Sequence, residues 1–147
     1  MTLPIALLVP LGLLVVLAAG RDLAERTIPN RLIAAALALA FVLQLWLAPA
    51  GWLMFLAGAL TGFLLFLPMY LLGGMGAGDV KLMLAIGAFA GPGLTLQIAA
   101  ASCIAGGGLS LGYLSAPRTS AKSHMPYGPA IAMGTATVLA YRFANVI

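Results

Sequence analysis

The sequence predicts an all-α polytopic membrane protein with about six transmembrane helices, the fourth of them short and preceded by a glycine-rich loop. Of the 147 residues, 63% are hydrophobic and only 7% are charged, whereas about a quarter of the residues in a soluble domain are charged. Apolar runs long enough to cross a hydrocarbon core of about 30 Å recur along the chain. We see no strand pattern, internal repeat or separate soluble region, so residues 1–147 are predicted to form a single integral membrane domain.

The predicted helices follow from the apolar runs and the connectors between them. In chain order, the runs cover residues 3–20, 32–49, 52–72, 80–90, 94–115 and 128–146. The first run lacks a basic segment before it and is followed by further runs, so we interpret it as a permanent helix rather than a cleaved signal peptide. The run 80–90 is too short, because at 1.5 Å per residue it covers only about half of the core. Such a segment needs neighbouring helices to shield it, unless its boundaries are wrong.

The basic residues alternate between connectors. They lie in 21–31, at Lys81 and in 116–127, with Arg142 as the exception, whereas the connectors 48–51 and 91–93 carry no charge. The positive-inside rule places the charged connectors in the cytoplasm and both termini outside. Charges spread over several loops form no basic face, so we expect the lipid bilayer, and no nucleic acid, as a partner.

No metal or cofactor is expected. Cys103 is the single cysteine and His124 the single histidine, and a structural metal site needs several such ligands close together. The stretch "GAGDVK" at 76–81 lacks the Lys-Ser/Thr ending of a phosphate-binding loop.

Asp22 and Asp79 are the candidate catalytic residues. Asp22 follows directly on the first apolar run and Asp79 opens the short fourth run, so both lie near the same membrane boundary and can meet. Two carboxylates a few ångströms apart cannot both ionise easily, so one keeps a proton near neutral pH. Such a pair can deprotonate a water and protonate a peptide carbonyl, which is aspartyl proteolysis. The remaining acidic residue, Glu25, is interpreted as a solvated charge.

The residues around Asp79 allow more than one interpretation. Gly76 and Gly78 permit positive φ and would let a substrate backbone approach the carboxylate. Lys81 either biases the ionisation of Asp79 or serves only as a positive-inside anchor. Asp79 itself could be a simple helix N-cap, and Asp22 an ordinary helix-terminal charge facing water.

Three segments resemble the prepilin peptidases of the type IV leader peptidase family. Gly76-Ala77-Gly78-Asp79, followed by "VKL", resembles the Gly-x-Gly-Asp signature of membrane aspartyl proteases. Asp22, with "RTIPNRL" at 26–32, resembles the family's first catalytic aspartate and the segment after it. The stretch "MPYGPAIAMG" at 125–134 resembles the Pro-aromatic-Gly-Pro stretch that opens the family's last helix. As candidate substrate-binding or loop residues we take Gly76, Gly78, Lys81, Pro126, Gly128 and Pro129.

The resemblance implies a function and a location. A family member would cleave the leader peptide of type IV prepilins or pseudopilins at the cytoplasmic face of the bacterial inner (plasma) membrane, without a cofactor. The long form of the family carries a Cys-rich loop between its first two helices and N-methylates the trimmed pilin. Here that connector has about eleven residues and no cysteine, so methyltransferase activity is in doubt. The short form resembles the peptidases of tight-adherence (Flp) pilus systems. The oligomeric state stays open.

Two other function classes remain alternatives. A small transporter or proton-conducting subunit could use the same carboxylates, although no inverted repeat is visible and both aspartates are predicted at one face. A non-enzymatic subunit of a pilus or secretion assembly would tolerate neutral asparagine at both positions. Cleavage of a prepilin distinguishes the peptidase from both.

Overall fold

The computed structural model describes residues 5–25, 28–114 and 127–144, and all the regular secondary structure in these residues is α-helical. The helices are α1 (Ile5–Glu25), α2 (Asn30–Leu47), α3 (Gly51–Leu71), α4 (Ala77–Leu114) and α5 (Gly128–Ala144). Within the described part, α1 to α4 are long and apolar enough to cross a membrane. The protein is therefore an all-α membrane protein, as its composition predicts.

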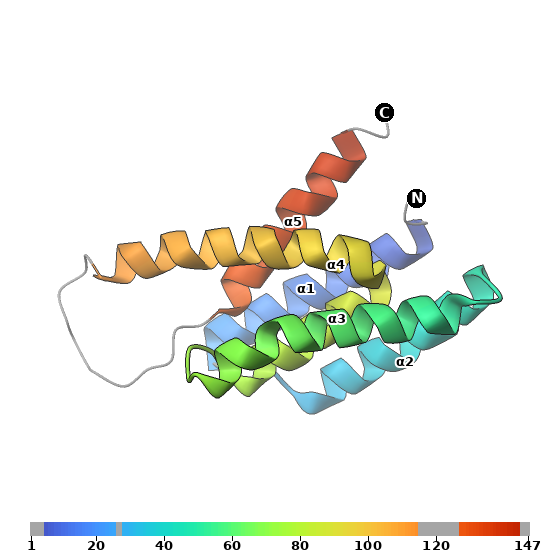
Figure 1. The fold of residues 1–147 in the computed structure, drawn as a ribbon, viewed down its shortest axis with the longest axis horizontal. Helices are drawn as coiled ribbons and strands as arrows, with labels where there is room; N and C mark the ends of the chain where they lie inside the picture. Colours follow the sequence, from blue (N-terminus) through green and yellow to red (C-terminus); the bar gives the residue numbers. More distant parts are fainter. Residues whose placement is uncertain (1–4, 26–27, 115–126, 145–147) are drawn as a thin grey trace.

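The predicted count of about six spanning helices is not confirmed, because the described residues form five helices. The predicted runs 80–90 and 94–115 both lie within α4, which is interrupted at Gly91 (φ 72°, ψ 169°). Glycine adopts positive φ at little cost, and Pro92 after it has no N–H to continue the helical hydrogen bonds. The chain reverses direction at this point (Figure 1). We call residues 77–90 the first arm of α4 and residues 92–114 its second arm.

The first arm of α4 packs very closely on α3. A Cβ added to Gly58 of α3 would overlap the carbonyl oxygen of Gly87, and a Cβ on Gly87 would overlap the carbonyl oxygen of Gly58. Four residues further along α3, a Cβ on Gly62 would overlap the carbonyl oxygen of Met83. Small residues let helix backbones approach in this way inside a membrane. The crossing fixes the arm whose first turn carries Asp79.

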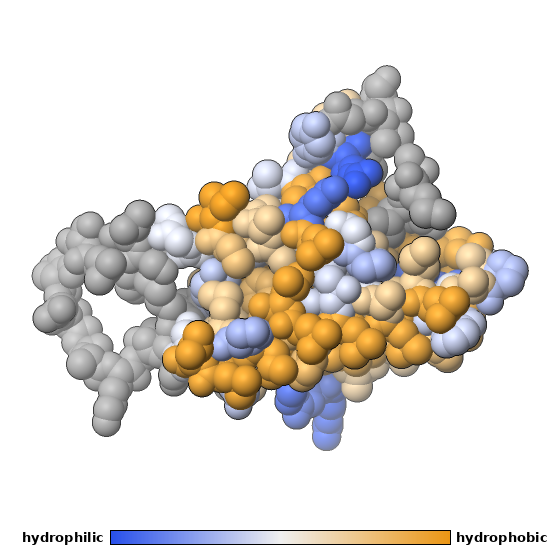
Figure 2. Space-filling view, in the orientation of Figure 1, coloured by the Kyte–Doolittle hydropathy of each residue, from blue (hydrophilic) through white to orange (hydrophobic). Residues whose placement is uncertain are grey.

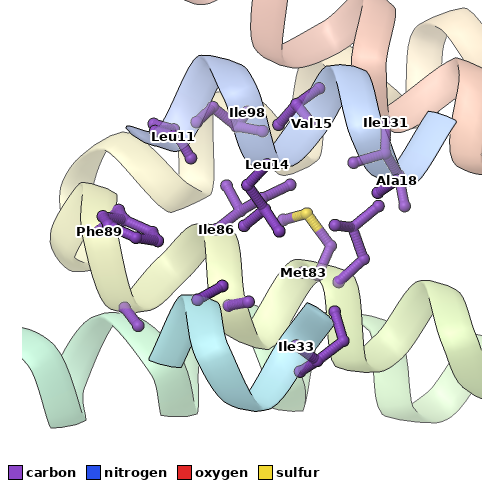
Figure 3. Packing of buried hydrophobic residues seen from close by; sticks show 14 of the residues in the cluster. Leu11, Leu14, Val15, Ala18, Ile33, Met83, Ile86, Phe89, Ile98 and Ile131 are labelled. Carbon is purple, nitrogen blue, oxygen red and sulfur yellow. The ribbon is translucent and has the colours of Figure 1, made fainter. Parts of the chain in front are cut away.

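The hydrophobic core surrounds the first arm of α4. In Figure 3, Leu14 of α1, Met83 and Ile86 of the first arm, and Ile131 of α5 converge on one another. In the most apolar 18-residue stretch of α4, 67% is buried inside the structure. The corresponding stretch of α1 is 33% buried, and those of α2 and α3 are 22% buried each. The segment that seemed too short to cross a bilayer is therefore enclosed by the other helices.

The outer faces of the helices are apolar. Figure 2 shows a broad hydrophobic surface, and large apolar side chains such as Val16, Val42 and Leu64 are more than half exposed. In a chain with several spanning helices, this surface is suited to contact with lipid. Trp46, near the end of α2, is 83% exposed, and tryptophan is enriched at the membrane–water interface.

A buried glutamine stabilises the bend in α4. The Gln44 side-chain amide of α2 donates hydrogen bonds to the carbonyl oxygens of Ala88 and Phe89, each at 3.2 Å. In a continuous helix the Ala88 carbonyl would accept from the N–H of Pro92, which has none. Because an unpaired carbonyl at membrane depth is costly, Gln44 supplies the missing donor.

Candidate active site

Asp22 and Asp79 come from different helices and lie at one site. Asp22 is in the last turn of α1, and Asp79 is in the first turn of α4. Both are buried, with 7% and 5% of their surface exposed, and their carboxylates lie close enough for their charges to interact. The alternative that Asp22 is a helix-terminal charge facing water is therefore wrong. The structure brings together the two residues that the sequence selected.

Asp79 is held by the loop directly before it. The backbone N–H of Gly76 donates to Asp79 Oδ2 at 3.3 Å, and the N–H of Asp79 donates back to the carbonyl oxygen of Gly76 at 3.1 Å. Because α4 begins at Ala77, Gly76 occupies the N-cap position and Asp79 is the third residue of the helix. A carboxylate at that position reaching back to the N-cap N–H is half of a capping box. Asp79 is therefore not the N-cap residue that the alternative interpretation assumed.

Asp22 is held by the start of the last described helix. The backbone N–H of Gly128, the first residue of α5, donates to Asp22 Oδ2 at 3.1 Å in a buried contact. A Cβ on Gly128 would overlap that same oxygen. Helix N-termini present unpaired N–H groups and favour acceptors that carry negative charge. Gly128, selected from the resemblance, thus directly contacts a proposed catalytic carboxylate.

The segment before α2 packs on the first turn of α4. A Cβ on Gly78 would lie 3.5 Å from the Ile28 side chain, and Lys81 Nζ donates to Asn30 Oδ1 at 3.0 Å. Lys81 is exposed and pairs with this amide. Ile28 and Asn30 were not among the predicted site residues, although the Ile-Pro-Asn segment of the resemblance was the signal for them.

Gly76 and Gly78 do not use the positive φ that glycine permits. In the loop before α4 the positive φ is at Gly73, at 75°, while Gly78 lies inside the helix. Met75, which follows the exposed Gly74, is 2% exposed and anchors the loop in the core. The positive φ therefore lies at Gly73, just after the end of α3, while a Cβ on Gly78 would make only an ordinary contact with Ile28.

Tyr127 is a buried residue at the site that sequence reasoning did not select. It directly precedes α5, is 8% exposed, and its ring packs edge-on against Phe66 of α3, with centroids 6.4 Å apart. Burial raises the pKa of Tyr127 above its ordinary value, with smaller contributions from Cys103 and Asp79. The hydroxyl therefore keeps its proton. Its only signal in the sequence was the aromatic position in "PYGP".

The other predicted residues are less closely involved. Pro129 is partly buried in the first turn of α5, where proline is well tolerated. Pro126 and His124 lie outside the described residues. Glu25 is exposed and pairs with Arg21 at 3.0 Å, which agrees with a solvated charge. Among the described residues, no group of three or more His, Cys, Asp or Glu side chains is placed to hold a metal ion.

Comparison with known proteins identifies one family. A model of the type IV leader peptidase family matches residues 8–111. The match includes Asp22, the segment before α2 and the whole Gly-Ala-Gly-Asp stretch, and it ends before α5. No curated protein and no solved structure matches the chain.

Proposed function

The chain belongs to the type IV leader peptidase family, and on this premise we propose that it is a membrane aspartyl endopeptidase that removes the leader peptide of type IV prepilins or pseudopilins. The observation that carries the proposal is the pair of buried, interacting carboxylates of Asp22 and Asp79. Burying two acidic groups side by side costs stability, and such costly arrangements cluster at functional sites. A shared proton between them is the ordinary requirement of aspartyl proteolysis.

The proposed reaction uses one carboxylate as a base and the other as an acid. The ionised carboxylate takes a proton from a water molecule, whose oxygen attacks the carbonyl carbon of the scissile peptide bond. The protonated carboxylate gives its proton to the carbonyl oxygen, which forms a neutral tetrahedral intermediate. This intermediate then collapses: one of its hydroxyl groups returns a proton to the second carboxylate, the C–N bond breaks, and the amide nitrogen leaves as an amine after receiving a proton from the first carboxyl group.

The charges near the site support cleavage at the cytoplasmic face. Asp22 and Asp79 lie at the helix ends next to Arg21, Arg31 and Lys81. The positive-inside rule assigns connectors with such charges to the cytoplasm, here of the bacterial inner membrane. A basic prepilin leader would stay on that side while its hydrophobic helix lies in the bilayer. The scissile bond between them would then be at the level of the two aspartates.

Substrate contacts are proposed for the glycine-rich loop and the start of α5. Gly76 donates to Asp79 and lies next to Gly78 and Lys81 in the chain, whereas Gly128, followed by Pro129, donates to Asp22. The short connector between α1 and α2, which contains no cysteine, supports the short, Flp-type subclass. The connector also lacks the Cys-rich region of the long form of the family, so we do not assign N-methyltransferase activity to this protein.

The test is cleavage of a prepilin in cells. The protein is co-expressed with an Flp-type prepilin in a host lacking other prepilin peptidases, and pilin size is followed by immunoblot. The variants are Asp22→Asn and Asp79→Asn, with Glu25→Gln as the matched control on the same helix as Asp22. We expect the wild type and Glu25→Gln to trim the pilin, and each asparagine variant to lose about 10²–10⁴-fold in rate at equal membrane abundance.

Other outcomes would exclude the proposal. If either asparagine variant cleaves at the wild-type rate, the paired-aspartate mechanism is wrong. If the wild type cleaves no prepilin, the protein is better explained as a transporter or as an assembly subunit. A proton-flux measurement in proteoliposomes separates those two, because only a transporter would lose flux in the asparagine variants.

A further inference from the structure

Tyr127 occupies a confined position between three helices. Its ring meets Phe66 of α3 edge-on, with an interplanar angle of 72°, and Phe66 itself is 1% exposed. On the second arm of α4, a Cβ on Gly106 would overlap the Tyr127 hydroxyl and the ring atoms next to it. The tyrosine side chain therefore fits only because residue 106 has no side chain.

The backbone of Tyr127 is tied to the start of α5. Its carbonyl oxygen accepts a hydrogen bond from the N–H of Ile131 at 3.1 Å, which closes the first turn of the helix. Ile131 is fully buried in the core. This hydrogen bond holds the backbone of Tyr127 in the first turn of α5.

The next residue makes the contact with Asp22. The N–H of Gly128 donates to Asp22 Oδ2 at 3.1 Å, and hydrogen bonds weaken steeply as their distance and angle depart from this range. The space between Gly128 and the carboxylate is also too small for a methyl group. A small displacement of the chain at Tyr127 would therefore move the donor off Asp22 or push it against the carboxylate.

We propose that Tyr127 is a positioning residue for the proposed peptidase reaction: wedged between Phe66 and Gly106, it holds the first N–H of α5 on Asp22. The inference rests on the proposed function, because it concerns the geometry of a catalytic carboxylate. It extends the site to α3 and the second arm of α4, neither of which contributes a carboxylate. Misplacing a catalytic group by about 1 Å can cost about 10²-fold in rate.

We assign this role to the aromatic ring. The ring makes the contact with Phe66, and its outer atoms, together with the hydroxyl, occupy the space beside Gly106. Tyr127→Phe keeps the ring and is expected to retain activity within about threefold of the wild type. Tyr127→Ala removes the ring and is expected to lose about 10²-fold in kcat, with KM for the prepilin changed less than about threefold. The matched control is Tyr141→Ala, at the other end of α5.

Substitution of Gly106 tests the same contact from the second arm of α4. Gly106→Ala adds a methyl group that overlaps the Tyr127 side chain, whereas Gly107→Ala, its neighbour, adds a Cβ with nothing within 4 Å. We expect Gly106→Ala to lower kcat about as much as Tyr127→Ala, and Gly107→Ala to leave it unchanged. Because both changes act through one contact, the double variant should be no worse than either single variant.

The experiment is steady-state cleavage of a purified prepilin by the full-length protein in liposomes. Equal amounts of each variant are used, and thermal unfolding checks that each variant is folded. The proposal is supported if Tyr127→Ala and Gly106→Ala lose activity through kcat alone and their losses are not additive. Tyr127→Phe should show no such loss. Activity of Tyr127→Ala within about threefold of the wild type overturns it, as do additive losses. If Tyr127→Ala does not fold, Gly106→Ala and Tyr127→Phe decide the question. Asp22→Asn and Asp79→Asn are measured in parallel, so that failure of the aspartate mechanism is distinguished from failure of the positioning role.

Discussion

The two carboxylates of the site are supported in opposite ways. Asp79 accepts a hydrogen bond from Gly76, three residues earlier in the chain. Asp22 accepts a hydrogen bond from Gly128, 106 residues later in the chain. The first contact is determined by a short stretch of sequence, whereas the second depends on how α5 packs against the rest of the protein. One half of the site is therefore a local motif and the other half a product of the tertiary fold.

The largest difference between the two halves should appear when a methyl group is added at each glycine donor. In Gly128→Ala the Cβ overlaps Asp22 Oδ2, while in Gly76→Ala it lies 3.5 Å from Asp79 Oδ2, an ordinary contact. We expect Gly128→Ala to lose about 10²-fold in the rate of prepilin cleavage and Gly76→Ala to lose several-fold less. Cleavage by purified variants in liposomes measures both rates.

The control for this comparison is Gly20→Ala, which adds a Cβ with nothing within 4 Å, two residues before Asp22. It should cleave at the wild-type rate. Equal losses in Gly128→Ala and Gly76→Ala would contradict the distinction between local and tertiary support.

A second difference concerns stability. The arm that carries Asp79 is fixed by the crossing of Gly58 and Gly87, where either added Cβ would overlap a backbone carbonyl oxygen. Overpacking of this kind typically costs about 1–3 kcal/mol. We expect Gly58→Ala and Gly87→Ala each to lower the free energy of unfolding by that amount, as measured by denaturant titration in detergent micelles.

Gly12→Ala is the matched control for the crossing, because its Cβ meets nothing within 4 Å. It should unfold like the wild type. If the crossing variants are as stable as Gly12→Ala, the close packing of α3 on the first arm is not what fixes Asp79.

The smallest effect is expected at the exposed edge of the site. Lys81 Nζ donates to Asn30 Oδ1 at 3.0 Å in an exposed contact, and exposed polar pairs contribute little. We expect Lys81→Met and Asn30→Ala each to change the cleavage rate by less than about fivefold, measured with the same liposome assay. A loss as large as that of the aspartate variants would contradict this expectation. It would support the alternative from the sequence, in which Lys81 biases the ionisation of Asp79.

The sequence predicted the features that depend on composition and on neighbouring residues. Apolar runs locate α2 and α3 to within a few residues, because a spanning helix needs a long apolar stretch. The first helix extends past the predicted end at residue 20 to Glu25, since its last turn carries charges that interrupt the apolar run. The Gly-Pro-Gly at 91–93 was correctly interpreted as separating two helical segments, but a single non-helical residue, Gly91, is enough to separate them.

The contacts between distant helices could not be predicted in the same way. Gln44 is one polar residue in an apolar run, and nothing nearby in the sequence shows that it would reach the carbonyl of Ala88. The fit of Tyr127 against Gly106 depends on the close approach of α5 to the second arm of α4. The residues that position Asp22 were therefore found only once the fold was known, apart from Gly128, which the resemblance supplied.

The closeness of the two carboxylates can be measured without any substrate. In a Cys103→Ala background, Asp22→Cys and Asp79→Cys are combined in one protein in native membranes and treated with a short bifunctional thiol reagent. Leu23→Cys with Asp79→Cys is the matched control, because Leu23 is 67% exposed, whereas Asp22 beside it is buried. The account predicts rapid intramolecular cross-linking of the 22/79 pair and little of the 23/79 pair. Absence of a 22/79 cross-link in folded protein would contradict a single site built from both aspartates.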